Sequence, residues 1–114
     1  MSGRRILIIE DEHMLAKALS RALQETGADV VGMAATVEQA LALLEATPDV
    51  DGALVDINLR GVRAYSVADA LAGRGVPFVF TTGYSSATIP DRYRNITVLQ
   101  KPYEAQEIIG ALFG

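Results

Sequence analysis

The chain has 114 residues, half of them hydrophobic, a size that suits one compact domain over residues 1–114. It contains no cysteine, which excludes disulfides and thiolate metal sites and leads us to expect a cytoplasmic protein. Ten Lys and Arg against fourteen Asp and Glu give a net charge of −4, so direct nucleic-acid binding is not expected, and no apolar run is long enough to span a membrane.

The chain opens with an alternation of short aliphatic runs and helical patterns. The first run, residues 5–10, predicts a strand. Apolar residues then recur every three or four positions over residues 14–23, which predicts a helix that ends near Gly27. A second run predicts a strand over residues 29–33.

The middle of the chain continues the alternation. Thr36 and Gln39 have the spacing of a capping box at the start of a second helix, whose apolar stripe ends before Pro48. A third strand is expected over residues 52–56 and a third helix over residues 65–72.

The last third of the chain departs from this regularity once. A fourth strand is expected over residues 77–81, but the stretch SSATIPDRYRN that follows has little apolar periodicity and contains Pro90, so we expect at most one or two helical turns. A fifth strand over residues 97–100 and a final helix over residues 104–113 complete the pattern.

Five such units predict an α/β fold, a doubly wound five-stranded parallel sheet with helices on both faces. In such sheets ligands lie beyond the carboxyl ends of the strands. The residues expected at those ends are Glu10, Asp11, Asp56, Thr82 and Lys101. We therefore expect the chemistry of the protein at this edge.

Three carboxylates at one edge require a cation, because two unit charges about 4 Å apart repel by roughly 4 kcal/mol at an effective dielectric constant near 20. Lys101 offsets one charge, and the oxygen-only set Glu10, Asp11 and Asp56 suits Mg²⁺. A Mg²⁺ site beside a lysine and a hydroxyl is typical of phosphoryl chemistry, with a carboxylate as nucleophile.

Four short motifs occur in order, each at the end of an expected strand: IIEDE, LVDINL, FTTG and the Lys-Pro of QKPY. With them the chain resembles the receiver domain of two-component response regulators over nearly its whole length. The segments FTTGY, AYSVADAL and RGVPFVF are most similar to stand-alone receivers of alphaproteobacterial type. The resemblance implies a (βα)5, flavodoxin-like fold with no output domain in this chain.

The resemblance also implies a role for each site residue. Asp56 would accept the phosphoryl group, Thr82 would hydrogen-bond it and Lys101 would pair with one of its oxygens. The Mg²⁺ ligands would be Asp11 and Asp56 directly, Asn58 through its backbone carbonyl and Glu10 through water. The Lys101–Pro102 peptide bond would be cis.

Three positions depart from the family pattern. Val98 stands where many receivers have an aromatic residue that couples phosphorylation to the output face, and Tyr84 is a candidate replacement. Arg60 stands where many members have proline, so we expect a less rigid loop after Asp56. Glu10 replaces the more usual aspartate, which a water-mediated ligand tolerates.

Other polar residues near the site have simpler interpretations. Glu12 is expected to be a first-turn acid of the following helix, and His13 a solvated surface residue. Tyr65 and the segment Arg60 to Arg63 are expected in an exposed loop, and Thr81 is expected to point away from the side on which Thr82 lies.

The leading functional hypothesis is a phosphoryl-accepting receiver that switches partner binding, acts as a relay intermediate or acts as a phosphate sink. It would be limited to self-phosphorylation and autodephosphorylation rather than being an enzyme. Its expected partners are a histidine kinase or phosphotransfer protein and an unknown downstream protein, with a monomer favoured over an activation-dependent homodimer. One alternative is a Mg²⁺ phosphatase of the haloacid dehalogenase type, in which a second aspartate would occupy the position of Asn58. Another is a receiver-like binding module that takes no phosphate.

Overall fold

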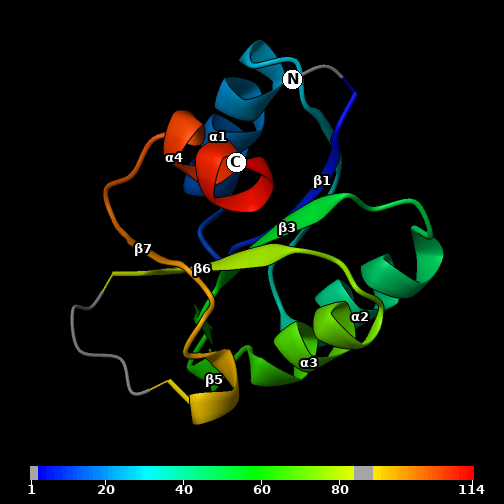
Figure 1. The fold of residues 1–114 in the computed structure, drawn as a ribbon, viewed down its shortest axis with the longest axis vertical. Helices are drawn as coiled ribbons and strands as arrows, with labels where there is room; N and C mark the ends of the chain where they lie inside the picture. The colour runs from blue at the N-terminus through cyan, green and yellow to red at the C-terminus, as the bar shows by residue number, and fades with distance from the viewer. Residues whose placement is uncertain (1–2, 84–88) are drawn as a thin grey trace.

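The computed structural model describes residues 3–83 and 89–114. Five parallel strands form one sheet in the order β2-β1-β3-β6-β7 (Figure 1). The strands are β1 (Arg5–Ile9), β2 (Asp29–Ala34), β3 (Gly52–Asp56), β6 (Phe78–Thr82) and β7 (Val98–Gln100). The doubly wound parallel sheet predicted from the sequence is therefore confirmed, with strand bounds that shift by one residue at most.

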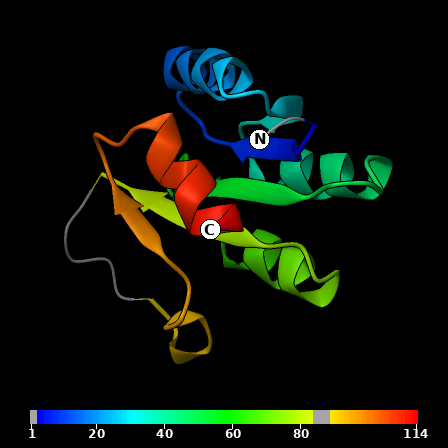
Figure 2. The same ribbon diagram turned by 45° about the horizontal axis from the view of Figure 1, so that its top comes forward.

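Helices cover both faces of this sheet (Figures 1 and 2). One face packs against α1 (His13–Glu25) and α4 (Ala105–Phe113), and the other packs against α2 (Val37–Ala46) and α3 (Tyr65–Gly73). Neighbouring residues of a strand belong to opposite cores: Ile8 and Leu54 pack under α1 and α4, whereas Ile9 and Val55 pack under α2 and α3. This alternation explains why the strands read as unbroken apolar runs.

The helix starts differ in detail from the sequence predictions. The Thr36 hydroxyl accepts a hydrogen bond from the Gln39 N–H, as a capping box requires. The Gln39 side chain, however, accepts from the N–H of Ala35 rather than of Thr36, so only half of the predicted box forms. Glu12 is the residue preceding α1 rather than a first-turn acid, and the exposed His13 is the first residue of that helix.

The expected shortening of the fourth helix is confirmed. Between β6 and β7 the described residues contain one helical element, the three-residue 3-10 helix η1 (Asp91–Tyr93), which Pro90 precedes. Tyr93 is only 4% exposed, and its ring packs against Phe78, Phe80 and Tyr65. The prediction of Tyr65 as exposed loop chemistry is wrong, because it begins α3 and stacks on Tyr93.

A small antiparallel hairpin follows β3, where an exposed loop was predicted. Its strands are β4 (Asn58–Leu59) and β5 (Val62–Arg63), with Leu59 buried. The two residues between them, Arg60 and Gly61, have φ angles of 53° and 84°. Positive φ at both central positions is the requirement of a type I′ turn, the connection that matches the twist of a two-residue hairpin.

Over residues 3–83 and 89–114, none of the helices is both long and apolar enough to cross a membrane.

Candidate functional site

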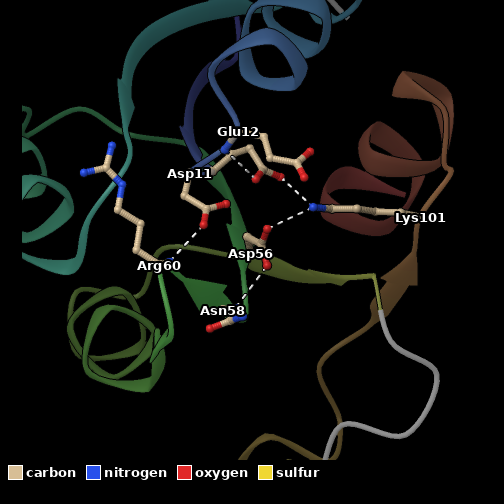
Figure 3. Close-up of polar contacts among 7 residues, drawn as sticks. Asp11, Glu12, Asp56, Asn58, Arg60 and Lys101 are labelled. Atoms are coloured by element: carbon tan, nitrogen blue, oxygen red, sulfur yellow. Dashed lines mark hydrogen bonds and ion pairs between the residues drawn. The ribbon is translucent and has the colours of Figure 1, made fainter.

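The carboxyl ends of four sheet strands bring reactive side chains together (Figure 3). Glu10 and Asp11 follow β1, Asp56 ends β3, Thr82 ends β6 and Lys101 follows β7. Glu10 is 3% exposed and Asp56 is 5% exposed, so both carboxyl groups are held at the floor of the site rather than in bulk solvent. They follow or end strands that are buried throughout in β3 and from Ile6 onward in β1, which fixes their geometry before any ligand arrives.

Lys101 lies between the two buried carboxyl groups. Its Nζ is 3.1 Å from Glu10 Oε1 and donates a hydrogen bond to Asp56 Oδ2 at 3.0 Å. Burial acts to lower the pKa of Lys101, but the bonds and charges of Asp56 and Glu10 outweigh it and raise that pKa. The lysine is therefore a permanent cation at neutral pH.

Glu10 is the group in this site whose ionisation is most strongly shifted. Burial raises its pKa to about 7, and the neighbouring Asp56 adds to the rise. The N–H of Glu12, 3.1 Å from Glu10 Oε2, and the ammonium of Lys101 oppose it. Near neutral pH a substantial part of Glu10 is therefore protonated until further positive charge enters the site.

Asp11 is held by the hairpin. The N–H of Arg60 donates a hydrogen bond to Asp11 Oδ2 at 2.9 Å (Figure 3). Partial burial would raise the pKa of Asp11, but the bond from the Arg60 N–H and the other nearby donors lower it overall. Asp11 is thus an ionised carboxylate at neutral pH, beside Glu10, whose pKa is raised.

Both oxygens of Asp56 have donors. Oδ1 accepts from the N–H of Asn58 at 3.0 Å, and Oδ2 accepts from Lys101. These bonds fix the plane of the carboxylate in the lining of a cleft of about 270 Å³. The cleft is lined by Asp11, Glu12, Asp56, Asn58, Thr82, Gly83 and Lys101.

The donor set fits a hard divalent cation. Glu10, Asp11 and Asp56 each offer an oxygen, and the three oxygens lie within 4.8 Å of one another. Oxygen-only ligands at the mouth of an open cleft suit Mg²⁺, which keeps several of its waters. A cation there would also offset the repulsion that holds the pKa of Glu10 high.

A family model described as the response regulator receiver domain matches residues 6–113. The chain belongs to this family.

Two named proteins are similar to this chain, one in sequence and one in both sequence and structure. The transcriptional regulatory protein PdtaR of Mycobacterium tuberculosis is 29% identical over 96% of this chain, which spans only about half, 55%, of PdtaR. The solution structure of SdrG from Sphingomonas melonis Fr1 is 40% identical, with a TM-score of 0.84 and complete coverage of both chains. The BeF3-activated conformation of SdrG is also 40% identical and superposes with a TM-score of 0.82.

Most of the residues singled out in the sequence lie in or beside the receiver's cleft. Thr82 lines it, whereas Thr81 is fully buried and is not among the lining residues. The Lys101–Pro102 bond is cis. Val98 lies on the edge strand β7, 37% exposed, and Tyr84 falls outside the described residues.

The sequence reasoning missed two contributions to the site. Glu12 was assigned to the helix, yet it lines the cleft and its N–H binds Glu10. Arg60 was noted as a missing proline and as part of an exposed loop, yet its N–H binds Asp11. The type of a residue does not reveal which contacts its backbone makes. The one available signal was that Arg60, unlike proline, has a backbone N–H to donate.

Proposed function

We propose that this receiver is a phosphoryl-accepting switch in which Asp56 is the acceptor. Receiver domains interact with histidine kinases or phosphotransfer proteins, and this chain belongs to that family. The observation that supports the proposal most directly is the position of the Asp56 carboxylate, which lines the cleft and is fixed there by Lys101 and Asn58.

In the proposed reaction an Asp56 oxygen attacks the phosphorus of a phosphohistidine or of a small phosphodonor. The new bond is an acyl phosphate, and the bond that breaks is the one between phosphorus and the imidazole nitrogen or the carboxylate leaving group. Lys101, next to Asp56 Oδ2, neutralises charge on the incoming group. Thr82 lines the cleft where its hydroxyl would hydrogen-bond a phosphoryl oxygen.

Asp11 and Asp56 would hold Mg²⁺ directly, with the Asn58 carbonyl as a further ligand and Glu10 acting through water. The cation would supply charge neutralisation for the phosphoryl oxygens. Under this proposal the protein turns over no external substrate beyond its own phosphorylation and dephosphorylation, and it works in the cytoplasm as a monomer with one downstream partner.

The test is to incubate the protein with Mg²⁺ and acetyl phosphate and to measure the adduct by intact-protein mass spectrometry. We expect a single base-labile phosphoryl adduct that Asp56→Asn abolishes, because among residues 3–83 and 89–114 only the Asp56 carboxylate both contacts Lys101 and lines the cleft. Asp49→Asn, which changes an exposed aspartate away from the site, is the matched control and should leave the adduct intact.

The other outcomes separate the alternatives. Sustained hydrolysis of a phosphoester by wild-type protein would favour a phosphatase. The complete absence of an adduct, with Mg²⁺ binding intact, would favour a binding module that takes no phosphate.

A further inference from the structure

The hairpin after β3 presents backbone N–H groups to the acidic site. Asn58 and Arg60 are two residues apart, and their N–H groups bind Asp56 Oδ1 at 3.0 Å and Asp11 Oδ2 at 2.9 Å. Alternate residues of an extended segment direct their N–H groups to the same side. One N–H from β4, that of Asn58, and one from the turn that follows, that of Arg60, therefore serve the two carboxylates of the site.

Arg60 contributes through its backbone and not through its charge. Figure 3 shows its side chain directed away from the carboxylates while its N–H faces Asp11. Its φ of 53° lies in the left-handed region, which is unfavourable for a residue with a side chain. The type I′ turn with Gly61 maintains this conformation, and in it the Arg60 N–H reaches Asp11.

The bond to Arg60 occupies one oxygen of Asp11 and leaves the other for a ligand. In Figure 3 that second oxygen is turned toward Asp56. An exposed aspartate rotates freely about its side-chain bonds, so a carboxylate fixed at one oxygen loses less conformational entropy when the other binds a cation. Groups that orient a metal ligand in this way contribute strongly to metal affinity.

We propose that the Arg60 amide is a positioning group for the cation site, which fixes Asp11 through Oδ2 so that Oδ1 faces the cation. The inference rests on the proposed function only in taking the cation to be Mg²⁺. The bond from Arg60 persists when the cation binds, because the two use different oxygens of Asp11.

The first experiment measures Mg²⁺ affinity by calorimetric titration of the unphosphorylated protein. Arg60→Ala and Arg60→Gly keep the N–H and should bind Mg²⁺ as the wild type does. Arg60→Pro removes the N–H and should bind about 10- to 100-fold more weakly. Wild-type affinity in Arg60→Pro would overturn the proposal, and so would an equal loss in Arg60→Ala, which would assign the effect to the guanidinium.

Proline also disfavours the turn itself, because its φ is fixed near −65°. A second measurement therefore uses the native hairpin: amide hydrogen exchange at Arg60, followed by NMR. We expect slow exchange in the wild type both without and with Mg²⁺, and fast exchange in Asp11→Ala. Loss of protection when Mg²⁺ is added would overturn the proposal, because the cation and the amide would then compete for Asp11.

Neither measurement involves phosphoryl transfer. If no adduct forms on Asp56 while the Arg60 results hold, the proposed switch fails and the positioning role stands. If the adduct forms while the Arg60 variants bind Mg²⁺ equally well, the reverse is true.

Discussion

Glu10 and Asp56 share one cation, the ammonium of Lys101, yet they are not equivalent. Asp56 has a donor on each oxygen, from Asn58 and Lys101. Glu10 is more deeply buried, and its pKa is raised to about 7. In the absence of a divalent cation, ionised Glu10 is therefore a source of instability in the folded protein.

This shift predicts how stability depends on pH. The pKa of Glu10 is about 7 in the folded protein against an ordinary value of 4.5, so between these values the folded state binds more protons than the unfolded state. The contribution of Glu10 to the free energy of unfolding should therefore decrease as pH rises from about 4.5 to 7. In Mg²⁺-free buffer, Glu10→Gln should be more stable than the wild type at pH 8 by about 1 to 3 kcal/mol, and the gain should vanish at about pH 4.5.

Urea denaturation at the two pH values measures the effect. Glu12→Gln, which removes the charge of an exposed neighbour, serves as the control and should show no such pH-dependent gain. A Glu10→Gln protein less stable than the wild type at pH 8 would contradict the prediction, because the ion pair with Lys101 would then outweigh the burial of the charge.

At the scale of elements, the 3-10 helix η1 stands in the place of the fourth helix, which the sequence predicted to be short. Its Tyr93 is buried among the aromatic rings of β6 and α3, and the Tyr93 hydroxyl donates to the Asp69 carboxylate on α3. Arg92 reinforces this attachment with an ion pair to Asp69 at 3.0 Å. The backbone bonds of this short 3-10 helix, such as Arg94 N–H to the Asp91 carbonyl, are thus supplemented by side-chain packing and polar contacts to α3.

Truncation of this attachment should destabilise the domain. Tyr93→Ala removes a buried ring and should lower the free energy of unfolding by about 3 to 5 kcal/mol, whereas Tyr93→Phe removes only the hydroxyl and should cost about 1 kcal/mol. Urea denaturation measures both values. Arg94→Ala, at an exposed neighbouring position, is the control, and a Tyr93→Ala cost no larger than that of the control would show that η1 contributes little.

The elements that the sequence predicted well are those with a strong period. The unbroken apolar runs of β1 and β3 reflect strands that are buried on both faces, and the apolar stripe of α1 reflects a helix that is buried on one face. Because the strands are parallel, their carboxyl ends bring Glu10, Asp56 and Lys101 to the same edge of the sheet. The hairpin was missed because two-residue strands have no period and Arg-Gly is a weak signal for a type I′ turn. The contact of Tyr65 with Tyr93 was missed because it joins residues far apart in the chain without a recognisable motif.

At the scale of the whole molecule, three carboxylates, those of Glu10, Asp11 and Asp56, gather at one edge of the sheet. A cation that binds this edge in the folded state alone should stabilise the domain. At Mg²⁺ concentrations roughly 100 times the dissociation constant, the free energy of unfolding should rise by about 2.7 kcal/mol.

Urea denaturation across a range of MgCl2 concentrations, at constant ionic strength, tests this prediction. Asp11→Asn should reduce the stabilisation, because it removes the charge of the most exposed carboxylate of the set. If Asp11→Asn is stabilised as much as the wild type, the cation binds somewhere other than this edge.

The two edge strands of the sheet, β2 and β7, also influence whether the protein aggregates at high concentration. A long, flat outer strand can template the addition of strands from other molecules and so start aggregation. Here β7 has three residues and is soon followed by Pro102, which has no N–H to offer. At the opposite side of the sheet, the pairing of β2 with β1 shifts register between Ile6 and Leu7. Both outer strands are therefore poor templates, so we expect the domain not to extend its sheet with strands from other molecules at high concentration.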